Sequence, residues 1–134
     1  MKEILFRGKQ FNSDEWIEGQ LLYFKSSVNT DELAIIVKDC EWDHSRSWFN
    51  IGKRYRVNPM TINQYTGLND INCVKIFEGD IVEIFGNTYK VYWDKSDACY
   101  QTANCDYSFH KCASRSKVIG NIYDNPELLE KGGR

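Results

Sequence analysis

Three cysteines and one histidine near the C-terminal end are the residues of this chain that could hold a metal. Three thiolates and an imidazole can form a tetrahedral zinc site. The donors are Cys99, Cys105, His110 and Cys112. Their spacing contains no Cys-x-x-Cys pair, which zinc knuckles normally use. We therefore favour unligated thiols in a variable loop, keep the zinc site as the alternative, and expect no cofactor.

A second pair, Cys40 and His44, could serve as a nucleophile and its base. A catalytic thiol needs a nearby cation or a helix N-terminus that favours the thiolate, and nothing local to Cys40 supplies one. Cys40 also follows an apolar run and fits the buried end of a strand. The chain carries no phosphate-binding loop, dinucleotide glycine pattern or serine-hydrolase motif. We therefore predict that the protein is not an enzyme.

Aromatic and basic residues interleave in the middle of the chain. The aromatic residues are Trp42, Trp48, Phe49, Tyr55 and Tyr65, and the basic ones are Lys53, Arg54 and Arg56. Such a set can stack on single-stranded nucleic acid, with Lys53, Arg54, Tyr55 and Arg56 as the contacts. Aromatic residues of this kind also fill the cores of small β-proteins or cover subunit interfaces, where aromatics and Arg are enriched. All three interpretations stay open at this point, with core packing ahead.

Charge and hydrophobic composition limit the kinds of partner and compartment that fit this chain. The chain has 134 residues, with 17 basic against 19 acidic side chains and a net charge of −2, so a phosphate backbone is not the favoured partner. No apolar run reaches the roughly 18 residues of a membrane helix, and the N-terminus has no signal-peptide pattern. We expect a protein in the bacterial cytoplasm, with its five cysteines reduced.

The elements that must position these residues are mostly strands. Short β-rich runs are broken by Gly, Asn, Asp or Ser, which is typical of an all-β protein. We expect strands at residues 4–6, 16–24, 33–37, 55–57, 61–65 and 117–123. Residues 25–32 and 40–50 read as polar loops, and residues 99–113 as a long loop or ragged hairpin. A short helix follows, with Asp124 or Asn125 as its N-cap and Pro126 at its first position.

The most regular local pattern is a hairpin over residues 80–93. Gly86 and Asn87 lie between two alternating runs, and Gly at the first loop position suits a type II′ turn. This loop predicts the pairs Phe85–Thr88, Ile84–Tyr89, Glu83–Lys90 and Val82–Val91. Val82, Ile84, Tyr89 and Val91 should then face the core.

Two further segments carry recognisable motifs. One is Gln64-Tyr65-Thr66-Gly67-Leu68-Asn69-Asp70, running on into Ile76-Phe77-Glu78-Gly79-Asp80-Ile81-Val82, and the other extends from Val118 to Leu129. Together with the opening Lys2-Glu3-Ile4-Leu5-Phe6-Arg7-Gly8 and Glu15-Trp16-Ile17-Glu18-Gly19, they resemble the YopX family of small bacteriophage and prophage proteins. The matching residues are Tyr65, Thr66, Gly67, Leu68, Glu78, Gly79, Asp80, Gly120, Asn121 and Pro126, and we expect them to be structural. Residues 69–75 lack the glycine that the family carries in this turn, and Asn72 should take the left-handed conformation in its place.

The resemblance implies a mainly β fold, with an N-terminal β-meander packed on a small SH3-like barrel and a short C-terminal helix. We expect one YopX-like domain over residues 1–134, with an N-terminal lobe at about 1–58, the barrel at about 59–124 and the helix at 126–131. No activity comes with the family. We therefore expect a non-catalytic binding or assembly module whose partner is another copy or another phage or host protein. A nucleic-acid-associated β-barrel is the alternative.

Overall fold

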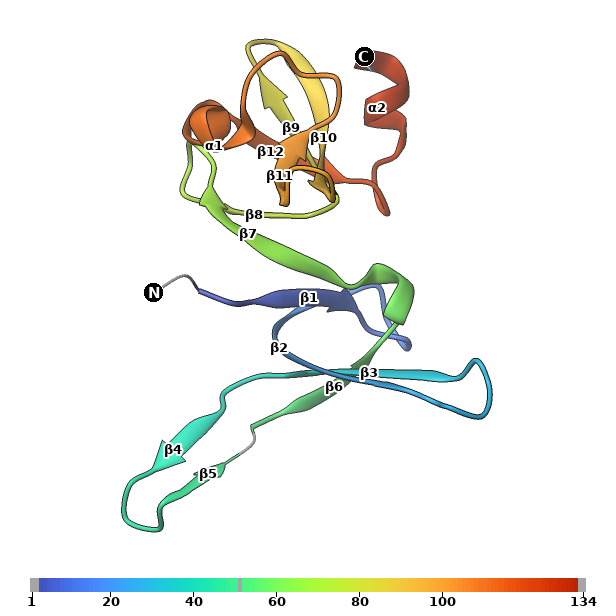
Figure 1. The fold of residues 1–134 in the computed structure, drawn as a ribbon, viewed down its shortest axis with the longest axis vertical. Helices are drawn as coiled ribbons and strands as arrows, with labels where there is room; N and C mark the ends of the chain where they lie inside the picture. The colour runs from blue at the N-terminus through green and yellow to red at the C-terminus, as the bar shows by residue number, and fades with distance from the viewer. Residues whose placement is uncertain (1–2, 51, 133–134) are drawn as a thin grey trace. The chain divides into compact units, whose positions relative to one another are not determined.

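The computed structural model describes residues 3–50 and 52–132 (Figure 1). The chain divides into two compact units, one covering Glu3–Gln64 and the other starting at Tyr65. Each unit is built around antiparallel strands, and α2 follows near the C-terminus, so the expected mainly β fold with a short helix is confirmed.

The first unit is a meander of strands followed by one 3-10 turn. It contains β1 (Phe6–Lys9), β2 (Trp16–Lys25), β3 (Glu32–Val37), β4 (Glu41–Asp43), β5 (Trp48–Asn50), β6 (Arg54–Val57) and η1 (Pro59–Thr61). The hydrogen-bonded order is β6-β3-β2-β1, and the start of β7 (Asn63–Asn69) lies beside β1. Cross-strand partners share a face, so the register places Ile17, Ala34, Ile36 and Val57 in one buried cluster.

β4 and β5 form a separate two-stranded hairpin (Figure 1). The prediction of a polar loop over residues 40–50 is therefore wrong. The signal was present as a three-residue alternation in Glu41-Trp42-Asp43, opposite a short aromatic run at Trp48 and Phe49. Strands this short fall below the length at which alternation can be recognised.

The second unit contains β8 (Lys75–Phe77), β9 (Asp80–Ile84), β10 (Asn87–Asp94), β11 (Cys99–Thr102), α1 (Phe109–Cys112), η2 (Ala113–Arg115), β12 (Lys117–Asn121) and α2 (Glu127–Gly132). Its main sheet has the order β11-β10-β9-β12, and the end of β7 pairs with β8. Among the described residues no pairing joins β11 to β12. The sheet is therefore open, and the SH3-like barrel is not confirmed.

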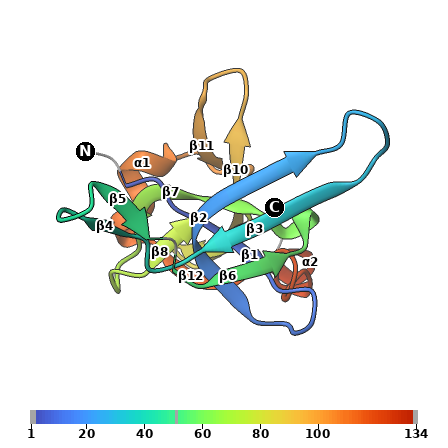
Figure 2. The same cartoon turned by 90° about the horizontal axis from the view of Figure 1, so that it is seen from below.

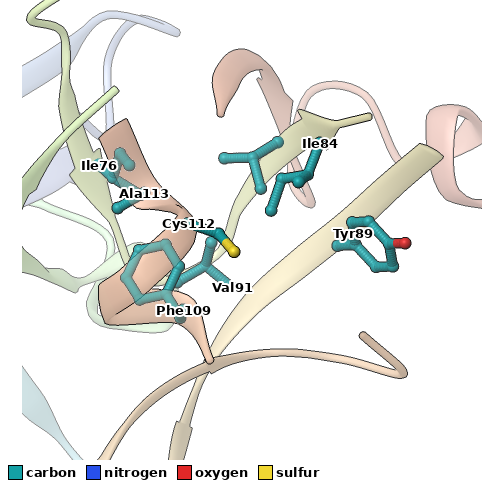
Figure 3. Close-up of a cluster of buried hydrophobic side chains, with 8 residues drawn as sticks. Ile76, Ile84, Tyr89, Val91, Phe109, Cys112 and Ala113 are labelled. Atoms are coloured by element: carbon teal, nitrogen blue, oxygen red, sulfur yellow. The ribbon is translucent and has the colours of Figure 1, made fainter. Parts of the chain in front are cut away.

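The core of the second unit gathers side chains from both the sheet and the segment after it (Figure 3). Val82, Ile84, Tyr89 and Val91 are all buried there, as the hairpin alternation predicts. Phe109 and Cys112 from α1 cover them together with Ala113. The expectation of a long loop or ragged hairpin over residues 99–113 therefore holds for the β10–β11 pairing of residues 99–102 and is wrong for the helix at 109–112. The missed signal is the helical spacing of Phe109, Cys112 and Ala113.

The loop of the β9–β10 hairpin begins one residue earlier than predicted, which changes the pairing of the two strands. The observed pairs are Ile84–Asn87, Glu83–Thr88, Val82–Tyr89 and Ile81–Lys90. The loop is therefore Phe85-Gly86, both with positive φ (51° and 86°), which matches a type I′ turn. This shift moves each partner by two residues and so preserves every face, which is why the predicted core residues are right although their partners are wrong. Glu83 therefore lies opposite Thr88 on β10, where Lys90 was predicted, and opposite Lys117 on its other neighbour, β12.

Candidate protein-interaction surface

The β4–β5 hairpin carries the most exposed cluster of aromatic side chains in the first unit. Trp42, Trp48 and Phe49 are 54%, 61% and 50% exposed. Trp42 lies opposite Phe49, while Asp43 lies opposite Trp48. The ring of Trp48 also stacks on that of Phe49 with centroids 5.4 Å apart. We call these two strands and their connecting turn the arm.

A tight joint connects the arm to the sheet of the first unit. Lys38 N donates to Lys53 O at 2.9 Å, and Asp39 has a positive φ of 59°. A Cβ atom at Gly52 would lie 1.9 Å from Lys38 O, so only glycine fits at this crossing. The joint thus fixes where the arm leaves the sheet, and Figure 2 shows it leaving in a different direction from the β2–β3 hairpin.

Asp43 organises the turn at the tip of the arm. Its Oδ1 accepts hydrogen bonds from Ser45 N at 3.0 Å and from Ser45 Oγ at 2.7 Å. The side-chain bond from Ser45 is the main cause that lowers the pKa of Asp43, so this carboxylate keeps its charge at neutral pH. Arg46 Nε lies 3.7 Å from Asp43 Oδ2.

A second exposed surface covers one side of the β2–β3–β6 sheet. The pairs Leu22–Ile35 and Phe24–Leu33 share this side with Arg56, which lies opposite Ile35, and with Arg54, which lies opposite Val37. Leu22 and Phe24 are 41% and 56% exposed, and both arginines are exposed. We call Leu22, Phe24, Leu33, Ile35, Arg54 and Arg56 the outer face.

The structure divides the predicted nucleic-acid segment between two sides of β6. Arg54 and Arg56 project from the outer face, whereas Tyr55 packs against the buried cluster of the first unit. Lys53 precedes the strand and is exposed. The guanidinium of Arg56 lies over the ring of Phe11, 5.1 Å from its centroid. The four residues therefore do not form one stacking platform.

The five aromatic residues of the predicted set also divide into a buried group and an exposed group. Tyr65 is buried against Phe77, with ring centroids 5.6 Å apart, and Tyr55 is half-buried. The core interpretation holds for these two residues and is wrong for Trp42, Trp48 and Phe49. The sequence left the core, interface and nucleic-acid interpretations open because nothing in the order of residues separates exposed aromatics from buried ones.

The candidate metal ligands do not converge. Within residues 3–50 and 52–132, no group of three or more His, Cys, Asp or Glu side chains could hold a metal ion. Cys112 is buried in the core and His110 is exposed on α1, while Cys99 begins the β11 strand. Cys105 packs against the rim of the core. The geometry gives the zinc alternative no support.

Cys40 and His44 are both exposed, so the interpretation of Cys40 as a buried strand-end residue is wrong. His44 approaches Trp42 edge to face, with ring centroids 6.4 Å apart. In the same part of the chain that the structure describes, no helix is long and apolar enough to cross a membrane.

The motif residues around Gly67 form a bulge. Thr66 Oγ1 donates to Ile76 O at 2.7 Å and accepts from Leu68 N at 3.2 Å. Gly67 has a φ of 88° where the β7–β8 register shifts, and the Tyr65 hydroxyl bonds to Asn69 Oδ1. These contacts bend the strand within the second unit.

The other motif residues close turns. Asp80 is buried and its Oδ2 accepts from Phe77 N at 2.8 Å, across the Glu78-Gly79 turn. Asn121 Oδ1 accepts from Tyr123 N at 3.0 Å and from Asp124 N at 2.9 Å. Gly120 lies beside Asn125, and Pro126 precedes α2.

Asp70 organises the turn that follows Leu68. Its Oδ1 accepts from Asn72 N at 2.8 Å and Val74 N at 2.9 Å, and its Oδ2 accepts from Val118 N at 2.9 Å. These bonds hold a turn in which Cys73, with a φ of 62°, takes the left-handed conformation that was predicted for Asn72. The Asp70-x-Asn72 pattern is typical of an Asx turn and was the available signal.

Three comparisons place the chain among known proteins. The family model described as "YopX protein" matches residues 5–130. The crystal structure of protein EF1440 from Enterococcus faecalis is similar, with a TM-score of 0.66 and 26% sequence identity. That match covers 96% of this chain and 99% of the Enterococcus chain. A search of curated protein sequences found no match.

Proposed function

Because this chain belongs to the YopX protein family, we propose that it is a phage- or prophage-type protein that acts by binding, without catalysis, in the bacterial cytoplasm. The observation that carries the proposal is the exposure of Trp42, Trp48 and Phe49 on the arm. An isolated two-stranded ribbon is marginally stable in water, and its large exposed aromatic side chains lose solvent only when something covers them. The arm therefore suits assembly with another protein chain, and self-association is the form that we favour.

The carboxylates of Glu41 and Asp43 beside the exposed aromatic side chains favour a protein partner over a nucleic acid. Trp and Phe are enriched in the cores of protein interfaces, where a few such anchors provide most of the binding free energy. The main-chain groups along an edge strand of the arm can also pair with a strand of a partner.

The test is the solution mass of the protein by light scattering over a range of concentrations. We expect a defined oligomer for the parent and a lower mass for the triple variant Trp42→Ser, Trp48→Ser and Phe49→Ser. A matched control replaces three exposed residues of the second unit, Ile71→Ser, Val74→Ser and Tyr107→Ser, and should keep the parent's mass. An arm variant with the parent's mass would contradict assembly through the arm.

The second candidate function is association with nucleic acid. The exposed side chains of Arg54 and Arg56, two residues apart on one side of β6, favour it. Adding single-stranded DNA to the same measurement separates the two functions. A shift in mass at low salt that disappears at high salt, and that is lost in Arg54→Ala with Arg56→Ala, would favour nucleic acid. Indifference to DNA at low salt would eliminate it.

A further inference from the structure

The arm and the outer face of the first unit are complementary in charge and in apolar character. Glu41 and Asp43 are alternate residues of β4 and project from one face of the arm, and Trp48, which pairs with Asp43, has its ring stacked on Phe49 beside them. The outer face carries two guanidinium groups beside four apolar side chains. One surface is thus acidic and aromatic, and the other is basic and aliphatic.

The spacing of the charges also matches. Glu41 and Asp43 are two residues apart on β4, and Arg54 and Arg56 are two residues apart on β6. Alternate residues of a strand lie on one face about 6.8 Å apart, so two carboxylates can meet two guanidiniums in one register. The cross-strand neighbours of Arg54 and Arg56 on this face are Val37 and Ile35, while Glu18, the acidic residue on the same face of β2, lies opposite Arg7 of β1.

Asp43 Oδ1 is held by Ser45 in the turn of the arm, so Asp43 Oδ2 is the carboxylate oxygen that an incoming guanidinium would share with Arg46. The Arg46 side chain is 81% exposed where it approaches Asp43, and a surface pair of this kind contributes little. Arg56 rests on the ring of Phe11, which is itself exposed, so its guanidinium stays at the surface. Both charge pairs therefore lie where an incoming chain can reach them.

From this complementarity, and resting on the proposed function, we propose that the arm of one copy docks on the outer face of a second copy of this chain. Glu41 and Asp43 of the arm face Arg54 and Arg56 of the receiving copy, and Trp48 packs on Leu22 and Ile35. Each copy offers one arm and one outer face, so two copies can exchange arms about a two-fold axis or dock head to tail. Reciprocal exchange gives a closed dimer, whereas repetition of a head-to-tail contact closes into a ring or extends into a filament, depending on the rotation between copies.

Charge reversal tests this docking directly. The first variant, Glu41→Arg with Asp43→Arg, has a basic arm and a basic outer face, and the second, Arg54→Glu with Arg56→Glu, has an acidic arm and an acidic outer face. We expect each variant alone to associate at least about tenfold more weakly than the parent. An equimolar mixture should associate again, since each arm then meets an outer face of opposite charge.

The controls reverse equal numbers of exposed charges in the second unit. Asp97→Arg with Asp106→Arg matches the first variant, and Lys95→Glu with Lys111→Glu matches the second. Both should associate as the parent does, and circular dichroism should show the parent's strand signal in all four variants. Light scattering of each variant, each control and the mixture gives the result.

The outcomes separate this docking from the proposed function. If the serine variant of the arm loses association but Arg54→Glu with Arg56→Glu keeps it, the arm binds elsewhere and only the docking on the outer face is overturned. If the serine variant of the arm keeps the parent's mass, assembly through the arm is overturned as well. A mixture that stays dissociated, or a parent that is monomeric at all concentrations, also overturns the docking between copies.

Discussion

At the scale of single residues, the second unit depends on carboxylates that accept main-chain N–H groups. Asp70 holds three of them and Asp80 holds the N–H of Phe77. Both carboxylates are buried, where an unsatisfied donor costs the full desolvation penalty. The motif that resembles the YopX family therefore contains residues whose observed contacts shape turns.

Replacing Asp70 with Asn should destabilise the second unit. The amide offers one acceptor oxygen, so its NH₂ group must face either Val118 N or the pair Asn72 N and Val74 N. We expect the free energy of unfolding to fall by about 1–3 kcal/mol. Urea unfolding measures it, and Asp97→Asn in an exposed turn, expected to change it by less than about 0.5 kcal/mol, is the control. Equal effects of the two substitutions would show that the three bonds contribute nothing specific.

Tyr100 should titrate at an unusually high pH. Burial, followed by the charge of Glu78, raises the pKa of Tyr100 to about 12. The unfolded chain ionises this phenol near about pH 10, so the stabilising contribution is complete below that pH and is lost as the pH rises towards 12. Tyr100→Phe should remove the highest phase of an absorbance titration of the folded protein, and Glu78→Gln should shift that phase to lower pH. A Tyr100→Phe titration that coincides with the parent's would refute the assignment.

At the scale of elements, the sequence predicted the strands of the β9–β10 hairpin but not the position of its turn. Side-chain alternation predicted the buried face of the β9–β10 hairpin, because a shift of partners by two residues leaves faces unchanged. The loop position depended on a choice between Gly86-Asn87 and Phe85-Gly86. Phe is disfavoured at positive φ, so the sequence pointed to the wrong choice. The observed loop has the twist that suits a two-residue hairpin.

The Phe85 position should therefore prefer Asn to Ala. Both substitutions remove the contact between the rings of Phe85 and Tyr107, whose centroids are 5.5 Å apart. Only Asn tolerates the φ of 51°, so Phe85→Asn should be more stable than Phe85→Ala by about 1 kcal/mol. Thermal unfolding of the two variants under the same conditions measures the difference. Equal midpoints would mean that the turn relaxes to a conformation without positive φ.

At the scale of the whole molecule, strands with several alternating residues were predictable and short or tertiary features were not. Residues 16–24 and 33–37 correspond to β2 and β3 because their patterns are long enough to recognise. The arm has three residues in each strand, and α1 has four. The exposure of Trp48 and the burial of Phe109 depend on which elements meet, and spacing along the chain does not encode that.

Removal of metal should leave the stability of the whole protein unchanged. Cys112 lies among the apolar side chains of the second unit's core, and in the described part of the chain no three His, Cys, Asp or Glu side chains converge to hold a metal ion. Protein prepared without a metal-chelating tag should contain less than about a tenth of an equivalent of zinc, and EDTA should leave its unfolding midpoint unchanged. A structural zinc ion would instead make folding depend on the metal, because its binding free energy is part of the folding free energy. A midpoint lowered by EDTA and restored by zinc, but not by calcium, would contradict the prediction and return Cys99, Cys105 and His110 to consideration as ligands.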